Sequence, residues 1–261
     1  MEYFEKIEKN PYKDLYWNVP EEQKKGEVAV VGGNAQNFRV PVKTAEYLMG
    51  NFPLKTVRVV LPETLKSKLP PLPDAVFLKD VAGGSIVDTD GLSAALEAVD
   101  FSVVVGDLSK NSVTAGAVGK AIIGGKKPIL ITRDAVDLIA GEKIEQILMR
   151  GDLTLVGSLV QMQKILKAVY YPKMLLTSQS LVQVVEVFHK FTLSYPTQIV
   201  TLHEGQILIA KNGQVVAVPM VKTPYSVLTI WNGEMAAQIV CLNLYNPGKF
   251  IEATVAAVMG K

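Results

Sequence analysis

The segment 229–237 holds the residues of this sequence best suited to chemistry. It reads Thr-Ile-Trp-Asn-Gly-Glu-Met-Ala-Ala, so that Gly233 stands directly before Glu234 where a helix is predicted to start. The first turn of a helix leaves backbone N–H groups without partners, and these groups bind anions such as phosphate. A carboxylate at the same place can accept a proton from a substrate hydroxyl. The alternative is that Glu234 is only a first-turn acid, favoured by the helix dipole.

Polar segments, enriched as a set in Gly, Asn, Ser and Asp, follow several other predicted strands. They are residues 32–38, 106–112, 132–134, 177–180 and 203–205. Gly, Asn, Ser and Asp allow close backbone approach and can hydrogen-bond to phosphate or ribose oxygens. Such residues are also common loop formers. Because ligands of open α/β sheets bind outside the carboxyl ends of the strands, their recurrence at these ends favours a binding edge.

Several standard sites are excluded. The sequence has no GxxxxGK[ST] loop, no GxGxxG fingerprint and no GxSxG elbow. Cys241 is the single cysteine, so a disulfide within the chain and a cysteine-based zinc site are both excluded. The two histidines, His189 and His203, fall on different predicted elements, which excludes a His-rich metal site. We therefore predict no metal site built from protein side chains alone, and we expect Cys241 to fill space in a core helix.

Composition narrows the class of protein further. The 27 basic and 25 acidic side chains leave a net charge of +2, too weak a field to attract nucleic acid or anionic lipid. With 49 % hydrophobic residues, the chain can bury a large core. The first residues carry acids and no apolar run, and no uncharged apolar stretch reaches the roughly 18 residues of a membrane span. A cytoplasmic protein is expected, while the oligomeric state stays open, a homo-oligomer included.

The elements that must position these residues alternate along the chain. Strands are predicted at 27–33, 56–61, 75–78, 101–106, 127–132, 153–156 and 174–177. Helices are predicted at 42–51, 92–99, 113–123, 135–140, 159–168 and 181–191. Three short strands follow at 198–202, 206–210 and 214–218, with the hairpin signal Asn212-Gly213 between the last two, and then helices at 233–244 and 250–259.

This order predicts an α/β fold, a three-layer αβα sandwich around a mostly parallel sheet with an antiparallel hairpin edge. Residues 1–24 are expected to form an N-terminal arm or short helix laid over the domain. Residues 25–261 are expected to form the domain itself.

With these elements in place, the chain resembles the ribokinase-like superfamily, and within it the ADP/ATP-dependent NAD(P)H-hydrate dehydratases. The resemblance runs from about residue 24 to residue 258. Val30-Val31-Gly32-Gly33-Asn34 resembles the family's first-strand Gly-Gly-Ser turn, and 38–41 falls on its Tyr-(Ser/Thr)-Gly-Ala-Pro segment. Further matches are residues 100–106 with Asp-x-Val-Val-Ile-Gly, 127–135 with Lys-Pro-Val-Val-Ile-Asp-Ala-Asp-Ala, 233–237 with Gly-Asp-Val-Leu-Ala, and 246–257 with the family's ending.

The resemblance implies a ribokinase-like fold and a metabolite-repair lyase. A nucleotide, ATP or ADP with Mg²⁺, phosphorylates the hydroxyl of hydrated NADH or NADPH, and loss of phosphate restores the nicotinamide. By position Glu234 would be the base and Asn232 and Gly233 part of the anion hole, with His203 and Gly205 in the phosphate-contacting turn. The substrate-binding residues that it implies are Gly33, Asn34, Phe38, Gly106 and Asp134.

The chain departs from the family at several of these turns. Gly-Gly-Thr-Gly-Asp is here Ile230-Trp231-Asn232-Gly233-Glu234, which replaces two glycines and lengthens the base by one methylene. Where the family has Gly-Pro-Gly after the fourth strand, this chain has Gly-Asp-Leu-Ser at 106–109. Where the family has Lys-Gly, it has His-Glu-Gly at 203–205, and the family's Thr-Pro-His-Pro-Gly-Glu segment is replaced by residues 153–158. Three functions therefore stay open: a divergent dehydratase, a catalytically weakened nucleotide-binding relative, and a small-molecule kinase of the same superfamily.

Overall fold

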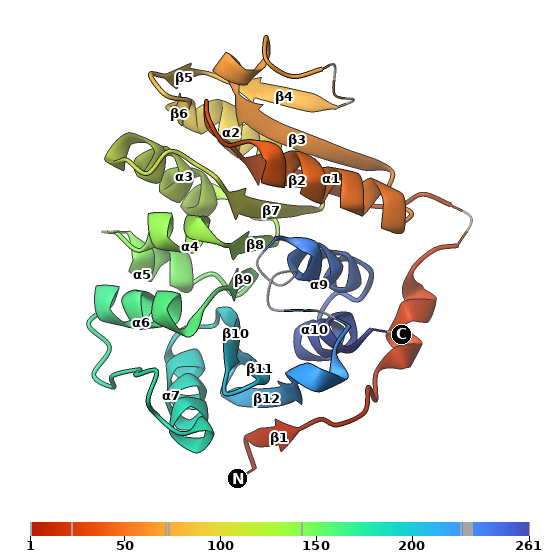
Figure 1. Cartoon of the computed structure of the whole chain (residues 1–261), viewed down its shortest axis with the longest axis vertical. Coiled ribbons are helices and arrows are strands. Elements are labelled where there is room, and N and C mark those ends of the chain that lie inside the picture. Colours follow the sequence, from red (N-terminus) through yellow and green to blue (C-terminus); the bar gives the residue numbers. More distant parts are fainter. Residues whose placement is uncertain are drawn as a thin grey trace.

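The structure is a computed structural model that describes residues 2–21, 23–70, 72, 74–141, 143–224, 226 and 232–260. Its main sheet has ten strands in the order β1-β12-β11-β10-β9-β8-β7-β2-β3-β4 (Figure 1). The strands are β1 (Phe4–Lys6), β2 (Glu27–Gly32), β3 (Thr56–Pro62), β4 (Ala75–Leu78), β7 (Phe101–Gly106), β8 (Ile129–Thr132), β9 (Leu153–Val156), β10 (Gln198–His203), β11 (Gln206–Lys211) and β12 (Gln214–Pro219). Neighbours from β4 to β10 are parallel, β10, β11 and β12 are antiparallel, and β1 is parallel to β12.

Helices cover both faces of this sheet. They are α1 (Arg39–Asn51), α2 (Thr89–Glu97), α3 (Ser112–Gly124), α4 (Asp134–Ile139), α5 (Ile144–Leu148), α6 (Leu159–Ala168), α7 (Leu181–Ser194), α9 (Glu234–Tyr245) and α10 (Phe250–Met259). Short 3-10 turns lie at η1 (Lys13–Asn18), η2 (Glu63–Leu65) and η3 (Met220–Lys222), and β5 (Asp80–Val81) pairs with β6 (Ser85–Ile86) in a small hairpin. Figure 1 shows α2 to α7 on one side of the sheet and α1, α9 and α10 on the other. The predicted αβα sandwich is confirmed.

Two apolar cores result, one on each face of the sheet. The first core lies between the sheet and α2 to α7, and the second lies between the sheet and α1, α9 and α10. Successive residues of a strand point to opposite faces, so Val31 enters the first core and Val30 the second. Both faces are apolar because both are covered, which is why the strand runs read as continuous hydrophobic stretches. Cys241 is fully buried in the second core, as predicted, and burial raises the pKa of its thiol.

The predicted hairpin is confirmed. Asn212 and Gly213 have φ of 50° and 78°, the backbone of a tight hairpin turn, and Lys211 pairs with Gln214 across it. The N-terminal arm contributes more than a short helix, because β1 pairs with β12 and becomes the outermost strand beside the hairpin. Of the helices in the described part of the chain, none is long and apolar enough to cross a bilayer.

The strand predicted at residues 174–177 is wrong. This stretch is an irregular turn closed by one side chain: Gln179 Oε1 accepts from Leu176 N at 2.8 Å, and Gln179 Nε2 donates to Met174 O at 3.2 Å. The side-chain amide thus takes the backbone groups that a sheet ladder would use. The short helix α5 and the hairpin β5–β6 were not predicted, because neither carries a long enough periodic pattern.

Candidate functional site

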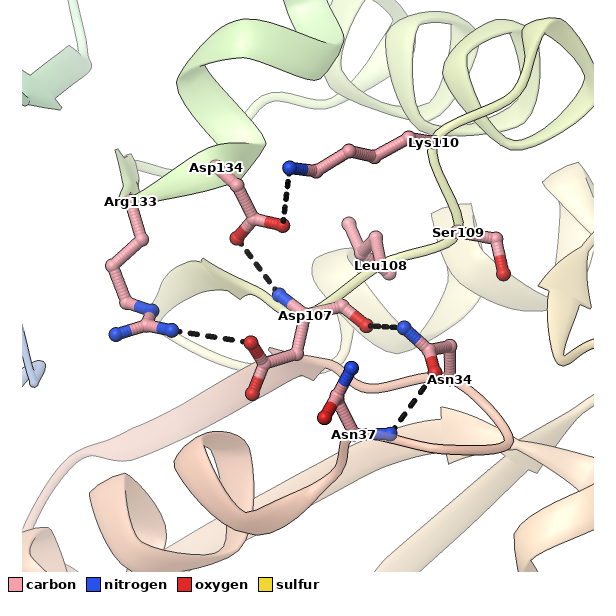
Figure 2. Close-up of a pocket in the computed structure, with 8 residues that line it drawn as sticks. All are labelled: Asn34, Asn37, Asp107, Leu108, Ser109, Lys110, Arg133 and Asp134. Carbon is pink, nitrogen blue, oxygen red and sulfur yellow. Dashed lines mark hydrogen bonds and ion pairs between the residues drawn. The ribbon is translucent and has the colours of Figure 1, made fainter.

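An open hollow of about 460 Å³ lies at the carboxyl ends of β2, β7 and β8 (Figure 2). It is lined by Asn34, Asn37, Asp107, Leu108, Ser109, Lys110, Arg133 and Asp134. Two of the predicted substrate-binding residues, Asn34 and Asp134, are among these eight. This is the edge at which ligands bind in open α/β sheets.

The turn after β2 is joined to the turn after β7 by backbone and side-chain bonds. Gly33 has φ of 88°, and its N–H donates to Gly106 O at 3.0 Å. Asn34 Nδ2 donates to Asp107 O at 2.6 Å, while Asn34 Oδ1 accepts from Asn37 N at 3.0 Å. One asparagine therefore both folds its own loop and fixes that loop against the neighbouring strand end.

Gly106 makes room for the carboxylate of Asp134. Its φ is 85°, and a Cβ built on it would lie 1.9 Å from Asp134 Oδ1. That oxygen instead accepts from Asp107 N at 2.9 Å. Gly33 and Gly106 thus lie beneath the hollow rather than among its lining residues, and they set the backbone path that brings Asn34 and Asp134 together.

Two cations and two carboxylates alternate across the hollow, as Figure 2 shows. Arg133 Nη2 donates to Asp107 Oδ1 at 3.1 Å, and Lys110 Nζ lies 3.9 Å from Asp134 Oδ2. Asp107 and Arg133 have φ of 56° and 57°, which is unusual for residues other than glycine. Strained backbone of this kind concentrates at functional sites.

Side chains of α4 and α6 support the strained backbone at Arg133. Gln161 of α6 donates from Nε2 to Arg133 O at 2.6 Å and to Asp137 Oδ2 at 2.7 Å. Lys164 in turn pairs with Asp137. Burial acts to raise the pKa of Asp137, but the hydrogen bonds from Lys164 and Gln161 and the nearby positive charges outweigh it, so this pKa lies below its ordinary value.

The predicted anion hole lies at the start of α9. Gly233 is its N-cap with φ of 98°, Glu234 is its first residue and partly buried, and Asn232 Nδ2 approaches Glu234 Oε1 at 3.4 Å. None of these three is among the residues lining the hollow. Ile230 and Trp231, which replace family glycines, lie outside the described residues.

The predicted phosphate-contacting turn lies between β10 and β11. His203 is 6 % exposed, and its Nε2 donates to Gln179 O at 2.8 Å, on the approach to α7. Glu204 Oε2 accepts from Leu181 N at 3.2 Å at the start of α7, and Gly205 O accepts from Met220 N at 2.7 Å. Phe38, predicted near the substrate, is the N-cap of α1 and packs against the second core. The ligand-binding roles of these residues stay predictions.

Asp107, Lys110, Arg133 and Asn37 lie in the polar segments 32–38, 106–112 and 132–134, but the sequence analysis did not single them out as site residues. A signal for two of them was present, because Asp107 replaces a family proline and Arg133 a family alanine. The side chains at these two positions face one another and form one of the two ion pairs of the hollow. Within the described ranges, no three His, Cys, Asp or Glu side chains gather so as to hold a metal ion.

No protein-family model matches the sequence, and a sequence search of curated proteins gives no match. Comparison of folds does find similar structures. A hypothetical protein from Streptococcus mutans has a TM-score of 0.68 at 16 % identity, over 97 % of this chain and 88 % of that one. A ribokinase-like superfamily protein from Enterococcus faecalis has a TM-score of 0.64 at 12 % identity, over 99 % and 87 %.

A third similar structure carries the name of an activity. The ADP/ATP-dependent NAD(P)H-hydrate dehydratase from Bacillus subtilis, co-crystallised with ATP and Mg²⁺, has a TM-score of 0.62 at 14 % identity. The alignment covers 97 % of this chain and 86 % of that one. Alignments of such length at such low identity show a shared architecture. The chain has the ribokinase-like fold.

Proposed function

We propose that this protein is a divergent nucleotide-dependent NAD(P)H-hydrate dehydratase, with ATP or ADP as phosphoryl donor. The observation that carries the proposal is the start of α9, a 12-residue helix, where left-handed Gly233 is the N-cap and Glu234 is the first helical residue. The unpaired amides of a helix start suit a phosphoryl group, and the carboxylate suits a hydroxyl that must lose its proton.

The start of α9 fits a nucleotide phosphate on one further ground. A Cβ on residue 233 would lie 2.8 Å from Thr44 Oγ1, so only glycine fits at the N-cap of α9 without displacing Thr44. Mg²⁺, when bound with the nucleotide, would neutralise negative charge that develops during transfer. A magnesium ion of this kind is held by one or two carboxylates and by the phosphates themselves.

In the proposed reaction Glu234 accepts the proton of the hydrate hydroxyl. The hydroxyl oxygen bonds to the transferred phosphorus, and the bond between that phosphorus and the rest of the nucleotide breaks. The amides of the α9 start stabilise the charge on the phosphoryl oxygens. In the second step the C–O bond breaks, phosphate leaves with the electron pair, and loss of a proton from the adjacent carbon restores the ring double bond. No net oxidation or reduction takes place.

The hollow at the ends of β2, β7 and β8 is the proposed site of the hydrate. Its Asn37 amide and its charged side chains offer donors and acceptors to a neutral polar ring with a carboxamide, while the Asn34 amide holds the loop in place. Because Arg133 and Lys110 each face a carboxylate, the hollow carries no net excess of one sign among its four charged residues.

The experiment that tests the proposal is recovery of reduced-nicotinamide absorbance from hydrated NADH with ATP or ADP and Mg²⁺. Glu234→Gln should reduce the rate by about 100-fold or more, the usual contribution of a positioned base, with ATP affinity retained. The matched control is Glu252→Gln, which removes a first-turn acid from α10 instead. No recovery by the purified wild-type protein, or equal rates for both variants, would refute the proposal.

A second function is favoured by one specific observation. Ile230 and Trp231 stand where the family has glycines, which removes backbone freedom at a phosphate-binding turn. A protein weakened in this way would bind ATP, ADP or NADPH without turnover. Calorimetry with these three ligands, run beside the absorbance assay, separates binding with turnover from binding alone.

A further inference from the structure

Thr44 carries a buried hydroxyl that has no partner in the described part of the chain. It lies on the inward face of α1 with 2 % exposure, beside Pro41, Ala45 and Leu48. Its Oγ1 is inaccessible to solvent and has no hydrogen-bond partner among the residues that the structure describes. In a helix such a hydroxyl often bonds to the carbonyl four residues earlier, which this one does not do. An unsatisfied buried hydroxyl in a native protein needs an explanation.

The hydroxyl faces the start of α9. Of the Thr44 atoms nearest to a Cβ built on Gly233, Oγ1 lies at 2.8 Å, whereas Cβ and Cγ2 both lie at 3.9 Å. The oxygen rather than the methyl is thus turned towards the N-cap. About one turn further along, Gln238 Nε2 donates to Tyr47 Oη at 3.0 Å, which fixes α9 against α1.

The chemistry of the helix start decides what the hydroxyl can bond to there. The first turn of α9 presents N–H groups, which donate, so they offer no acceptor for the proton of Thr44. The side chain that would otherwise begin at residue 233 is absent. An anion held by those amides would supply the missing acceptor, and hydrogen bonds to a charged acceptor are stronger than neutral ones.

We propose that Thr44 is a ligand-binding residue whose hydroxyl donates to the phosphoryl group bound at the start of α9. The inference rests on the phosphate site of the proposed function and deepens it. It assigns a contact from α1 to a site otherwise built from the α9 turn. The ligand class is the terminal phosphate of a nucleoside di- or triphosphate. Because Thr44 and Gly233 meet, Thr44 also explains why glycine is required at the N-cap of α9.

The test is calorimetric titration of ATP and of ADP, each with Mg²⁺, into wild-type protein, Thr44→Val and Thr44→Ser. Valine keeps the shape of threonine and removes the hydroxyl, so nucleotide affinity should fall about 10-fold, the effect of one hydrogen bond to a charged group. Serine keeps the hydroxyl, so affinity should stay within about 2-fold of wild type. Thermal unfolding without nucleotide should show Thr44→Val at least as stable as wild type, because the buried hydroxyl has no partner to lose.

The outcomes separate this inference from the function on which it rests. Equal ATP affinity in Thr44→Val and wild type overturns the role of Thr44 and leaves the dehydratase proposal standing. Failure of wild-type protein to bind ATP and ADP overturns both. A Thr44→Val protein that loses stability in the absence of nucleotide indicates a structural hydroxyl and also overturns the inference. Should Thr44→Val fail to fold, Thr44→Ala against Thr44→Ser makes the same comparison, since both lack the γ-methyl group.

Discussion

Two regions at the carboxyl edge of the sheet have similar residue types and differ in structure. The hollow at β2, β7 and β8 and the turn 203–205 both combine glycine with polar residues. In the hollow, polar groups of three strand ends meet one another around open space, as with Asn34 and Asp107. At the other turn, His203 is buried and bonds to Gln179 O, while Glu204 accepts from the first N–H of α7.

The position of a turn relative to neighbouring strand ends therefore decides whether its polar residues can form a site. Turns that follow adjacent parallel strands face each other, so their side chains can share a site. The turn 203–205 connects antiparallel strands, and its side chains reach the loop before α7. Two of its polar groups are thereby engaged in holding α7 in place.

The largest effect is expected at the base of the hollow. Gly106→Ala should destabilise the protein by about 3 kcal/mol or more, because φ is positive and the new Cβ would meet the Asp134 carboxylate. Urea unfolding measures the change. The matched control is Gly116→Ala in α3, where nothing lies within 4 Å of the new Cβ, so stability should rise by about 0.5–1 kcal/mol. Equal responses at the two glycines would remove the argument that the hollow depends on its backbone path.

Much of the fold could be predicted from the sequence because local patterns set it. The apolar runs of β7 and β9 and the periodic helices α6 and α10 fall at or near their predicted bounds. The strand at residues 174–177 was wrong because the amide of Gln179 competes for the backbone, an interaction that apolar pattern does not report. Strand β1 is three residues long, and its pairing with β12 is a tertiary event.

The candidate site was less predictable than the fold. The family resemblance placed Asn34 and Asp134 near the substrate. Arg133 lies in the same polar segment as Asp134 but was not singled out, since its importance comes from a left-handed backbone and from Asp107, which is 26 residues earlier. Thr44 could not be predicted from the sequence, because only its tertiary contact with Gly233 distinguishes it from any other threonine in a helix.

The next largest effect is expected in the turn 203–205. His203→Ala should cost about 2 kcal/mol of unfolding free energy, because Gln179 O would lose its buried donor. ATP affinity should stay within about 2-fold of wild type, since the donor is already engaged. Urea unfolding and calorimetry measure the two quantities. A tenfold loss of ATP affinity with unchanged stability would give His203 the phosphate role that the family resemblance implies, and the contrast between the two turns would no longer hold.

A smaller effect is expected from strain at Arg133. Its φ of 57° and ψ of −140° belong to a region that glycine occupies readily and other residues do not. Arg133→Gly should therefore be about 1–2 kcal/mol more stable than Arg133→Ala, although both lack the guanidinium. At Lys120, an exposed position within α3, the order should reverse, with glycine about 1 kcal/mol less stable than alanine. The same order at both positions would mean that the turn relaxes and that the hollow stores no strain.

The smallest effect concerns the ionic support beneath the hollow. The pKa of Asp137 is held below its ordinary value by Lys164 and Gln161 despite partial burial, so ionised Asp137 stabilises the folded state. That contribution is present at neutral pH and is lost as pH falls through the lowered pKa of the folded state. Wild type and Asp137→Asn should therefore differ at pH 7 by less than about 1 kcal/mol, since the pair is partly solvated, and converge as the pH is lowered from neutral through the lowered pKa of Asp137. Urea unfolding across this range measures the convergence. A difference that stays constant with pH would assign the support to the neutral bond from Gln161 to Arg133 O, and the hollow would then depend on hydrogen bonds alone.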